Sequence, residues 1–279
     1  MAVLGVGRTS YYCPRTTRTK ADATAVKQLL TAHQQHPFYG VRRLALHLGW
    51  SQNKARRIRT LAGITVPRLG KRYRYRHTKP EITAPPNILH RWAVFKDDNR
   101  PQDGMDYAGM VEASAWVQDF TYLWFERSMQ YLAIVLDLKT RQVVGWRLGC
   151  NHSSELTHAA LLDALSKHPP PAILHSDQGS EYLSHKHEVL CARMEIQLSA
   201  SAKASPWQNG FMERFFGGFK QELGNLNQFK DLAQLHEGIA LQIHYYNTKR
   251  IHTALKTTPA AYAASLNKSR DNLFAEKGA

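Results

Sequence analysis

Apolar residues recur at the three- and four-residue spacing of α-helices between residues 22 and 62. This spacing predicts a helix over 22–35, a second over Val41–Leu48, and a third that begins after Ser51, a residue suited to cap a helix N-terminus. Gly49 separates the last two helices, and two short helices joined by a tight glycine-containing turn are typical of a helix-turn-helix motif. An ordinary three-helix bundle with basic outer faces is the alternative interpretation.

From residue 114 the pattern changes to that of strands, with short runs rich in β-branched and aromatic residues. Three such runs predict an antiparallel meander over Ser114–Phe125, Gln130–Leu138 and Gln142–Leu148. Helices and short strands then alternate: a helix over Ser153–Lys167, a strand over Ala172–Ser176, a helix from about Ser180 to Arg193, a strand over Ile196–Ser199, a long helix, and a helix over Leu232–Asn247. This order predicts an α/β architecture with a mixed sheet.

A basic segment bounded by prolines separates these two parts. In KRYRYRHTKP (Lys71–Pro80) arginine and tyrosine alternate, so cations could hold phosphates while rings stack on bases. A linker without a binding role is the alternative. The predicted division is a helix-turn-helix domain over 1–66, a basic linker or arm over 67–86, a core with C-terminal helices over 87–267, and a tail over 268–279.

Positive charge is concentrated at the N-terminal end of the chain. The net charge is +15, and the first 80 residues hold 17 of the 37 Lys and Arg residues but only one of the 22 acidic residues, Asp22. Phosphate neutralisation with release of counterions is the main use of such a density, so nucleic acid is the expected partner. An anionic membrane surface would require a basic amphipathic helix with large apolar anchors, and this pattern is absent from the sequence.

Composition and motifs exclude several other classes of protein. The longest clean apolar stretch, Leu132–Leu136, is far shorter than the ~20 residues needed to cross a bilayer. The three cysteines, Cys13, Cys150 and Cys191, are far apart and form no C-x-x-C pair, which argues against a disulfide scaffold or a cysteine-rich zinc site. No G-x-x-x-x-G-K-[ST] phosphate loop is present, so the use of ATP is not implied.

Three carboxylates are candidates for a metal site. Asp119 lies near the end of the first predicted strand, Asp177 directly follows the strand that ends at Ser176, and Glu213 lies in the first turn of the long helix. Catalytic groups collect at strand ends of α/β sheets, and carboxylate oxygens suit Mg²⁺ or Mn²⁺. Two such ions could activate a nucleophile and stabilise the leaving oxygen at phosphorus. Lys220, two helical turns beyond Glu213, could grip a DNA backbone.

Each of these acids also has a structural interpretation. Asp119 could satisfy a turn or pair with a lysine, Asp177 could cap the following helix, and Glu213 could be a surface residue. Other residues are assigned supporting roles: hairpin shaping for Asp137, support of the site at most for Glu181, site orientation for His175, and a helix-surface pairing for Glu222. Three tryptophans are expected in the core: Trp116, Trp124 and Trp146.

Extended blocks of the sequence carry a family resemblance. They are LGVGRTSYY (Leu4–Tyr12), HPFYGVRRLALHLGW (His36–Trp50), WVQDFTYL (Trp116–Leu123), YLAIVLDLKTRQVVGW (Tyr131–Trp146), LHSDQGSEY (Leu174–Tyr182), SPWQNGFMERFF (Ser205–Phe216) and YYNTKRIHTALKTTP (Tyr245–Pro259). In this order they resemble the OrfB-type transposase of the IS-three family of bacterial insertion sequences, whose core is similar to retroviral integrases. The family's acidic triad, with 35 residues between its second and third acids, maps onto Asp119, Asp177 and Glu213, and its downstream basic residue maps onto Lys220.

The resemblance implies a fold and an activity. The fold would be a ribonuclease H-like mixed five-stranded sheet flanked by helices, preceded by an all-α helix-turn-helix domain. The activity would be that of an integrase-type DNA transposase, which cleaves the ends of an insertion sequence and joins the freed 3′-hydroxyl to another DNA strand. Two Mg²⁺ (or Mn²⁺) ions held by the three acids would support this phosphoryl transfer. Alternatives are a catalytically inactive DNA-binding repressor or relic, and a structure-selective nuclease.

The resemblance also implies partners and a location. The partners would be the terminal repeats and target DNA, further copies of the chain assembled on DNA, and an upstream reading frame fused by frameshifting, with no membrane involved. The location would be the bacterial cytoplasm, with the nucleoid. The residues expected to contact DNA are Lys220 and a set of basic residues before the core: Arg42, Arg43, Lys54, Arg56, Arg57, Arg59, Lys71, Arg72, Arg74 and Arg76.

Overall fold

The structure is a computed structural model, and it describes residues 15–66, 84–89, 94–95, 105–106, 114–202 and 209–277. The chain divides into two compact units. Unit 1 comprises residues 1–68 and 251–257, and unit 2 comprises residues 69–250 and 258–279. Most of the expected arm, with Lys71, Arg72, Arg74 and Arg76, lies outside the described residues.

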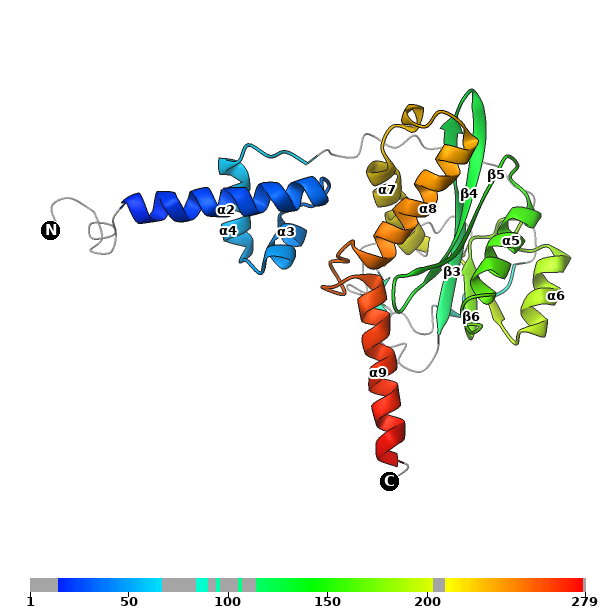
Figure 1. The fold of residues 1–279 in the computed structure, drawn as a ribbon. Coiled ribbons are helices and arrows are strands. Elements are labelled where there is room, and N and C mark those ends of the chain that lie inside the picture. Colours follow the sequence, from blue (N-terminus) through cyan, green and yellow to red (C-terminus); the bar gives the residue numbers. More distant parts are fainter. Residues whose placement is uncertain are drawn as a thin grey trace. The chain divides into compact units, whose positions relative to one another are not determined.

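The described part of unit 1 contains α2 (Arg15–Gln35), α3 (Val41–Leu48) and α4 (Gln52–Leu61), drawn in blue to cyan in Figure 1. Helix α2 begins at Arg15, earlier than the expected residue 22. Gly49 ends α3 in the left-handed conformation, with φ 65°, which glycine adopts without steric cost. Ser51 caps α4 as expected, because its hydroxyl accepts a hydrogen bond from the Lys54 backbone N–H at 3.2 Å.

The buried side chains of unit 1 follow the spacing expected for its helices. They are Ala25, Leu29, Ala32, Tyr39, Leu44, Ala45, Ala55 and Ile58. Residues 251–257, which the sequence placed in the core, belong to this unit, since Ile251 packs against the cluster and donates its backbone N–H to the Tyr39 hydroxyl at 2.7 Å. A polar contact between residues so distant in the chain has no signature in the sequence pattern.

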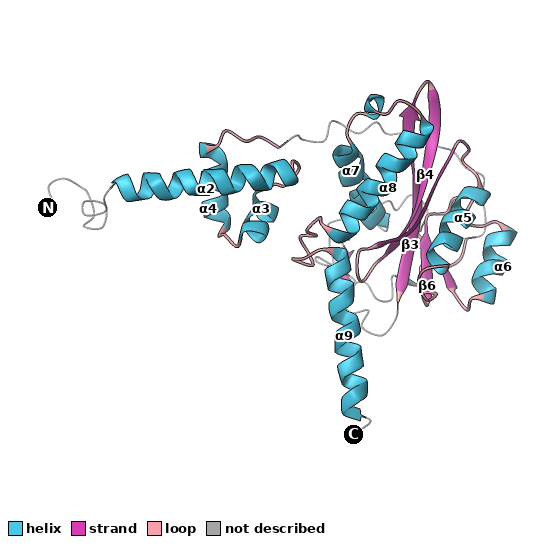
Figure 2. Cartoon of the chain, viewed as in Figure 1, coloured by secondary structure: helices cyan, strands magenta, loops and turns pink. Residues whose placement is uncertain are grey.

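Unit 2 is built on a mixed five-stranded sheet, as expected (Figure 2). Its strands are β3 (Ala115–Phe125), β4 (Ser128–Asp137), β5 (Val143–Gly149), β6 (Ile173–Ser176) and β7 (Gln197–Ala200), in the order β5-β4-β3-β6-β7. Strands β3, β4 and β5 form the antiparallel meander, β6 pairs parallel with β3, and β7 pairs parallel with β6. Two further short strands, β1 (Val94–Phe95) and β2 (Met105–Asp106), pair separately.

Helices cover both faces of this sheet. The helices of unit 2 are α5 (Ser154–Leu165), α6 (His185–Arg193), α7 (Gly210–Leu223), a short 3₁₀ helix (Leu226–Gln228), α8 (Leu232–Thr248) and α9 (Pro259–Lys277), of which α9 packs on α8. Figure 1 shows α7 and α8 on one side of the sheet and α5 and α6 on the other. Helix α6 begins at His185 rather than near Ser180, so the loop after β6 is longer than the pattern suggested. Helix α9 continues to Lys277, so the segment expected as a tail is largely helical.

The alternation of side chains along β3 produces two cores. Val117, Leu123 and Phe125 pack with α7 and α8, whereas Trp116 packs with α5 and α6. The expectation that Trp124 is a core residue is wrong, because its side chain is 63% exposed near the hairpin end of β3. Asp137 shapes its hairpin as expected, since it accepts hydrogen bonds from the backbone N–H groups of Lys139 and Thr140.

Two buried histidines connect neighbouring elements of unit 2. His175 of β6 lies 2.9 Å and 3.0 Å from the hydroxyls of Ser199 and Ser201. His187 of α6 lies 2.7 Å from the side-chain amide of Gln118 on β3. Burial lowers the pKa of both imidazoles from 6.5 to about 4, so both are neutral in the folded protein near pH 7.

We expect the free energy of unfolding to fall as the pH is lowered from 6.5 to about 4, because the unfolded chain takes up protons that the folded imidazoles do not bind. Each histidine contributes a slope of about 1.4 kcal/mol per pH unit in this window. His187→Gln should therefore flatten the pH dependence of denaturant unfolding by about that slope. His244→Gln, at an exposed position of α8, is the control, and equal slopes for both variants would contradict the prediction.

No helix in the described part of the chain is both long and apolar enough to span a bilayer.

Candidate active site

The pairing of β3 with β6 brings two of the three candidate acids to adjacent segments of the sheet. The last parallel pair is Val117 with His175, and Asp119 and Asp177 each lie two residues beyond it. Neighbouring strands lie about 4.8 Å apart. Asp119 is in the middle of β3 rather than near its end, opposite Ile134 of β4. The relevant strand end is that of β6, which stops at Ser176.

Asp119 is held at both of its carboxylate oxygens. The Phe120 backbone N–H donates to Oδ1 at 2.8 Å, and the Asn209 side-chain amide donates to Oδ2 at 3.0 Å. Asn209 stands at the N-cap position of α7, but its side chain makes no capping hydrogen bond there. Its contact therefore joins the start of α7 to β3. The sequence assigned Asn209 no role, although an asparagine directly before a helix is a recognisable signal.

Asp177 lies in the turn between β6 and α6. Its Oδ1 accepts the backbone N–H of Gly179 at 2.8 Å, so it shapes this turn rather than capping α6, which begins eight residues later. Glu181, which the sequence assigned at most a supporting role, is buried in the same loop. His152, at the loop before α5, lies 3.0 Å from Glu181 through Nε2.

Glu213 is brought to the sheet by the packing of α7. The apolar residues of this helix recur every three or four positions and bury against the sheet: Met212, Phe215, Phe216, Phe219 and Leu223. Glu213 follows Met212 in the first turn and is exposed. Lys220 lies two turns later on the same helix and is partly buried.

The charges of the neighbouring acids act on Asp119. Burial raises the pKa of Asp119 well above 3.8, and the charge of Asp177, followed by those of Glu181 and Glu213, raises it further. Tyr182 lies in the same field, since burial and then the charges of Asp119, Asp177 and Glu181 raise its pKa well above 10. Acids from a strand, a loop and a helix therefore share one negative region.

The donor set of this region suits a hard divalent cation, because it consists of carboxylate oxygens that repel one another. Each Asp119 oxygen makes one hydrogen bond and retains a further lone pair. Among the described residues, no three His, Cys, Asp or Glu side chains are yet arranged closely enough to bind a single ion. Binding would require the carboxylates to move towards one another, which a cation between them favours.

The end of α7 is fixed by a buried ion pair. Glu222 was expected on the helix surface, but its side chain is only 7% exposed, and Arg250 donates through Nε to both of its oxygens at 2.8 and 2.9 Å. Gln242 of α8 donates to the same carboxylate at 3.2 Å. A Cβ on Gly218 would stand 3.2 Å from Arg250 Nη2, so a glycine there leaves room for the guanidinium. The pair connects α7, which carries Glu213, to the end of α8.

The expected DNA-contacting residues of unit 1 differ in how they are engaged. Arg57 forms a two-bond contact with Asp22, at 2.5 and 2.8 Å, which joins α4 to α2. Lys54 lies over the Trp50 ring at 4.3 Å, and Arg43 lies over the Tyr39 ring at 5.7 Å. The remaining members of the set are Arg42 and Arg56, which are exposed, and Arg59, which is partly exposed.

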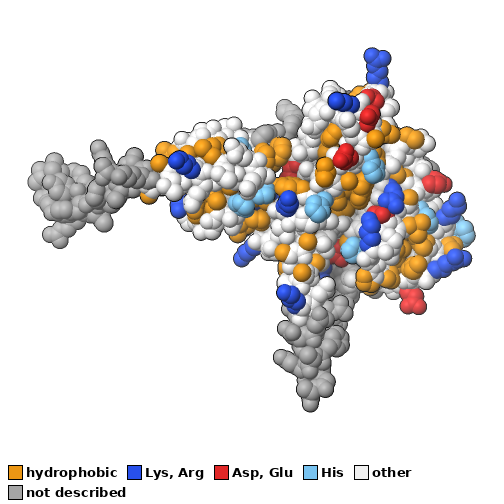
Figure 3. All heavy atoms as spheres, viewed as in Figure 1, with side chains coloured by type: hydrophobic (Ala, Val, Ile, Leu, Met, Phe, Trp, Pro, Cys, Tyr) orange, Lys and Arg blue, Asp and Glu red, His pale blue; other side chains and the backbone are white. Residues whose placement is uncertain are grey.

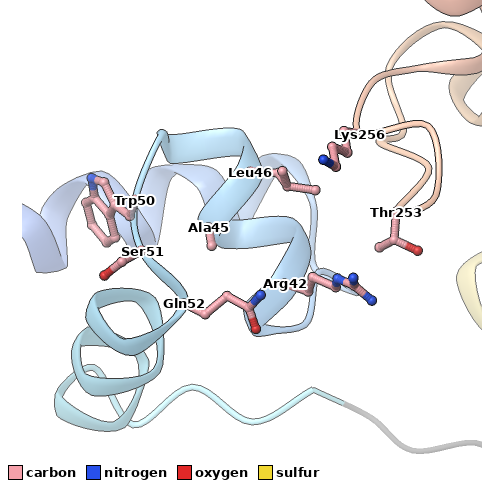
Figure 4. Close-up of a pocket in the computed structure, with 8 residues that line it drawn as sticks. All are labelled: Arg42, Ala45, Leu46, Trp50, Ser51, Gln52, Thr253 and Lys256. Carbon is pink, nitrogen blue, oxygen red and sulfur yellow. The ribbon is translucent and has the colours of Figure 1, made fainter.

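Unit 1 also contains a pocket of about 330 Å³ beside the turn between α3 and α4 (Figure 4). Its lining has two basic side chains and no acid: Arg42, Ala45, Leu46, Trp50, Ser51, Gln52, Thr253 and Lys256. On the face drawn in Figure 3, by contrast, basic, acidic and hydrophobic side chains are interspersed over the described residues. Charge alone therefore does not mark a binding surface on that face.

Comparison with known proteins identifies relatives of both the core and the whole chain. Two models of the integrase core domain match residues 112–206 and 194–259. The transposase for insertion sequence element IS904 of Lactococcus lactis is 32% identical over 191 residues, which cover 67% of this chain and 70% of that protein. A 31 kDa protein of insertion element IS600 from Shigella sonnei is 30% identical over 270 residues, which cover 93% of this chain and 96% of that protein.

Among solved structures, the catalytic core domain of HTLV-2 integrase in complex with magnesium is similar with a TM-score of 0.46 and 21% identity. The match covers 53% of this chain and 94% of that chain.

Proposed function

Because the chain belongs to the IS-three family of insertion-sequence transposases and contains an integrase core domain, it is a DNA transposase, and we propose that Asp119, Asp177 and Glu213 are its catalytic, metal-binding residues. Two Mg²⁺ or Mn²⁺ ions bound there would supply charge stabilisation at the reacting phosphate and a more reactive nucleophile. Lys220, farther along α7, would hold the DNA backbone beside them.

One observation supports this assignment above the others. The charges of Asp177 and Glu213 both act on Asp119, although 35 residues separate the first two in sequence and the three acids come from different elements. In the proposed reaction, water or a 3′-hydroxyl attacks at the end of the element, and the freed 3′-hydroxyl then attacks a phosphodiester of another strand.

The test uses duplex DNA that carries the inverted repeats flanking the gene, a target duplex, and Mg²⁺. Transposition predicts both cleaved ends and joined products, resolved on a denaturing gel. Nicks without joined products would indicate the structure-selective nuclease instead. Binding without any cleavage would indicate the inactive repressor or relic, which the family relationship does not favour.

We further propose that α4 of unit 1 contacts DNA phosphates through Arg56 and Arg59. Removing both side chains (Arg56→Ala with Arg59→Ala) should weaken binding to all sequences alike and reduce the slope of log K against log salt by about 0.9 for each lost phosphate contact. Fluorescence anisotropy from 50 to 200 mM salt measures this slope. Lys230→Ala, at an exposed position before α8, removes one positive charge and is the control, and a slope change no larger than twice the control's would contradict the proposal.

The remaining expectations about partners are proposals as well. The basic arm with Lys71, Arg72, Arg74 and Arg76 would track the DNA backbone, as its alternation with tyrosine suggests. Copies of the chain would assemble on paired DNA ends, and fusion to an upstream reading frame would add to end recognition. Sedimentation with and without end DNA would distinguish a monomer from such an assembly.

A further inference from the structure

We propose that Glu181, held in place by His152, is a positioning residue for the transposase reaction, because the pair fixes the loop that carries Asp177 into the acid cluster. This inference rests on the proposed function, and hydrogen exchange of the loop tests it separately from cleavage. The sequence placed Glu181 on a helix and assigned it at most a supporting role. The structure instead places it in a loop, buried, with its Oε1 3.0 Å from His152 Nε2.

Glu181 is a fourth carboxylate beside the three proposed catalytic acids. Glu181 is 4% exposed, and its charge acts on Asp119 together with the charges of Asp177 and Glu213. A buried acid is repelled by neighbouring acids and is poorly solvated, so it stays in such a place only where other groups hold it. The contacts of Glu181 are therefore informative.

Three groups from two parts of the fold hold Glu181. His152 Nε2 lies 3.0 Å from Oε1, and the Ser180 hydroxyl donates to Oε2 at 3.3 Å. The Thr157 hydroxyl of α5 donates to the Glu181 backbone carbonyl at 3.4 Å. The loop after β6 is thus attached to α5 and to the segment before it.

The imidazole of His152 is in turn fixed by the strands of the active site. Its ring centre lies 4.0 Å from that of Phe120, and it stacks on Tyr131 at 5.7 Å with an interplanar angle of 20°. Phe120 follows Asp119 in β3 and donates its backbone N–H to that carboxylate. The position of His152 is therefore set by the same strand that carries Asp119.

Gly179 brings the Glu181 and Asp177 carboxylates together. A Cβ on Gly179 would collide with the Glu181 carboxylate and would stand 2.9 Å from Asp177 Oδ1. The Gly179 backbone N–H donates to that same oxygen at 2.8 Å. Both carboxylates thus lie close to Gly179. A displacement of Glu181 would therefore change the packing around the Asp177 carboxylate.

The test compares His152→Ala, His152→Gln, Glu181→Ala and the double variant His152→Ala with Glu181→Ala. We expect each alanine variant to lower the single-turnover cleavage rate by about 10- to 100-fold while the Kd for end DNA stays within about twofold. His152→Gln should recover most of the rate, since its amide can donate to Glu181. The double variant should be no slower than Glu181→Ala, because the two residues act as one unit. His244→Ala, exposed on α8, should match the parent.

Hydrogen exchange of the peptide that spans residues 177–182 provides a readout independent of cleavage. His152→Ala should accelerate exchange there by about tenfold or more, with the rest of the core unchanged. If the parent cleaves no DNA but this acceleration is seen, the proposed function fails, and only the attachment of the 177–182 loop by His152 stands. Three results would each overturn the inference: unchanged hydrogen exchange in His152→Ala, cleavage losses that multiply in the double variant, or a Kd for end DNA that rises as the cleavage rate falls.

Discussion

Replacing Asp119 by Asn is expected to abolish DNA cleavage and at the same time to make the protein more stable. The loss of activity should be at least about 10³-fold, because charge stabilisation by bound metals is worth several kcal/mol and each 1.4 kcal/mol is a factor of ten in rate. The gain in stability follows from the raised pKa of Asp119, which results from burial and from the charge of Asp177. An amide of the same shape removes this unfavourable charge.

The two effects are measured separately. Cleavage of end DNA in Mg²⁺ gives the activity, and thermal unfolding in EDTA gives the stability. Because the folded protein holds the Asp119 proton more tightly than the unfolded chain does, the penalty exists at neutral pH and disappears as the pH falls through the raised pKa towards 3.8. The stability difference should therefore shrink on acidification. Glu237→Gln, exposed on α8, should change neither property, whereas full activity of Asp119→Asn would refute the catalytic assignment.

Replacing Gly145 by Ala is expected to destabilise unit 2 strongly, by about 2–4 kcal/mol. Gly145 lies on β5 opposite Val135, directly under α5. A Cβ there would collide with the backbone carbonyl of Ala160 and would stand 2.7 Å from both the backbone N and the Cβ of Ala164. Since most of these atoms belong to the helix backbone, relief requires α5 as a whole to move away from the sheet.

Denaturant unfolding of the full chain measures this cost. Gly210→Ala is the matched control, because a Cβ at Gly210, the first residue of α7, meets nothing within 4 Å. Alanine in a helix is intrinsically favourable by up to about 1 kcal/mol relative to glycine, so the control should be neutral or slightly more stable. Equal stabilities for the two variants would show that α5 is not closely packed on β5.

Much of the fold could be predicted because local sequence patterns determine its helices and strands. The spacing of apolar residues defines α3 at both ends, and Ser51 and Gly49 mark the turn before α4 through their own conformational preferences. The meander of β3, β4 and β5 follows from three runs of strand-forming residues, and the consecutive buried residues 115–118 of β3 fit a strand that is covered on both faces. The predictions failed where a local pattern does not show whether another element packs over a residue, as at the exposed Trp124.

The start of α6 shows a second limit. Apolar and polar residues after Asp177 are compatible with a helix from Ser180, but the hydrogen bonds of Asp177, Ser180 and Glu181 within the turn keep these residues out of it. Side chains that bond locally compete with helix formation, and which arrangement prevails depends on partners elsewhere, such as His152. The loop that carries Asp177 is therefore a tertiary feature.

Residue types along the chain were sufficient to single out Asp119, Asp177 and Glu213, to concentrate the basic charge in the first 80 residues, and to give the order of helices and strands. Only the folded chain decided that Asp119 and Asp177 lie on adjacent segments beyond the last β3–β6 pair, that Asn209 bonds to Asp119 and the charge of Glu181 acts on it, and that Arg250 pairs with Glu222 near the end of α7. The reason is physical: spacing records how each segment folds locally, whereas register, charge coupling and buried pairing depend on distances between segments that are remote in sequence.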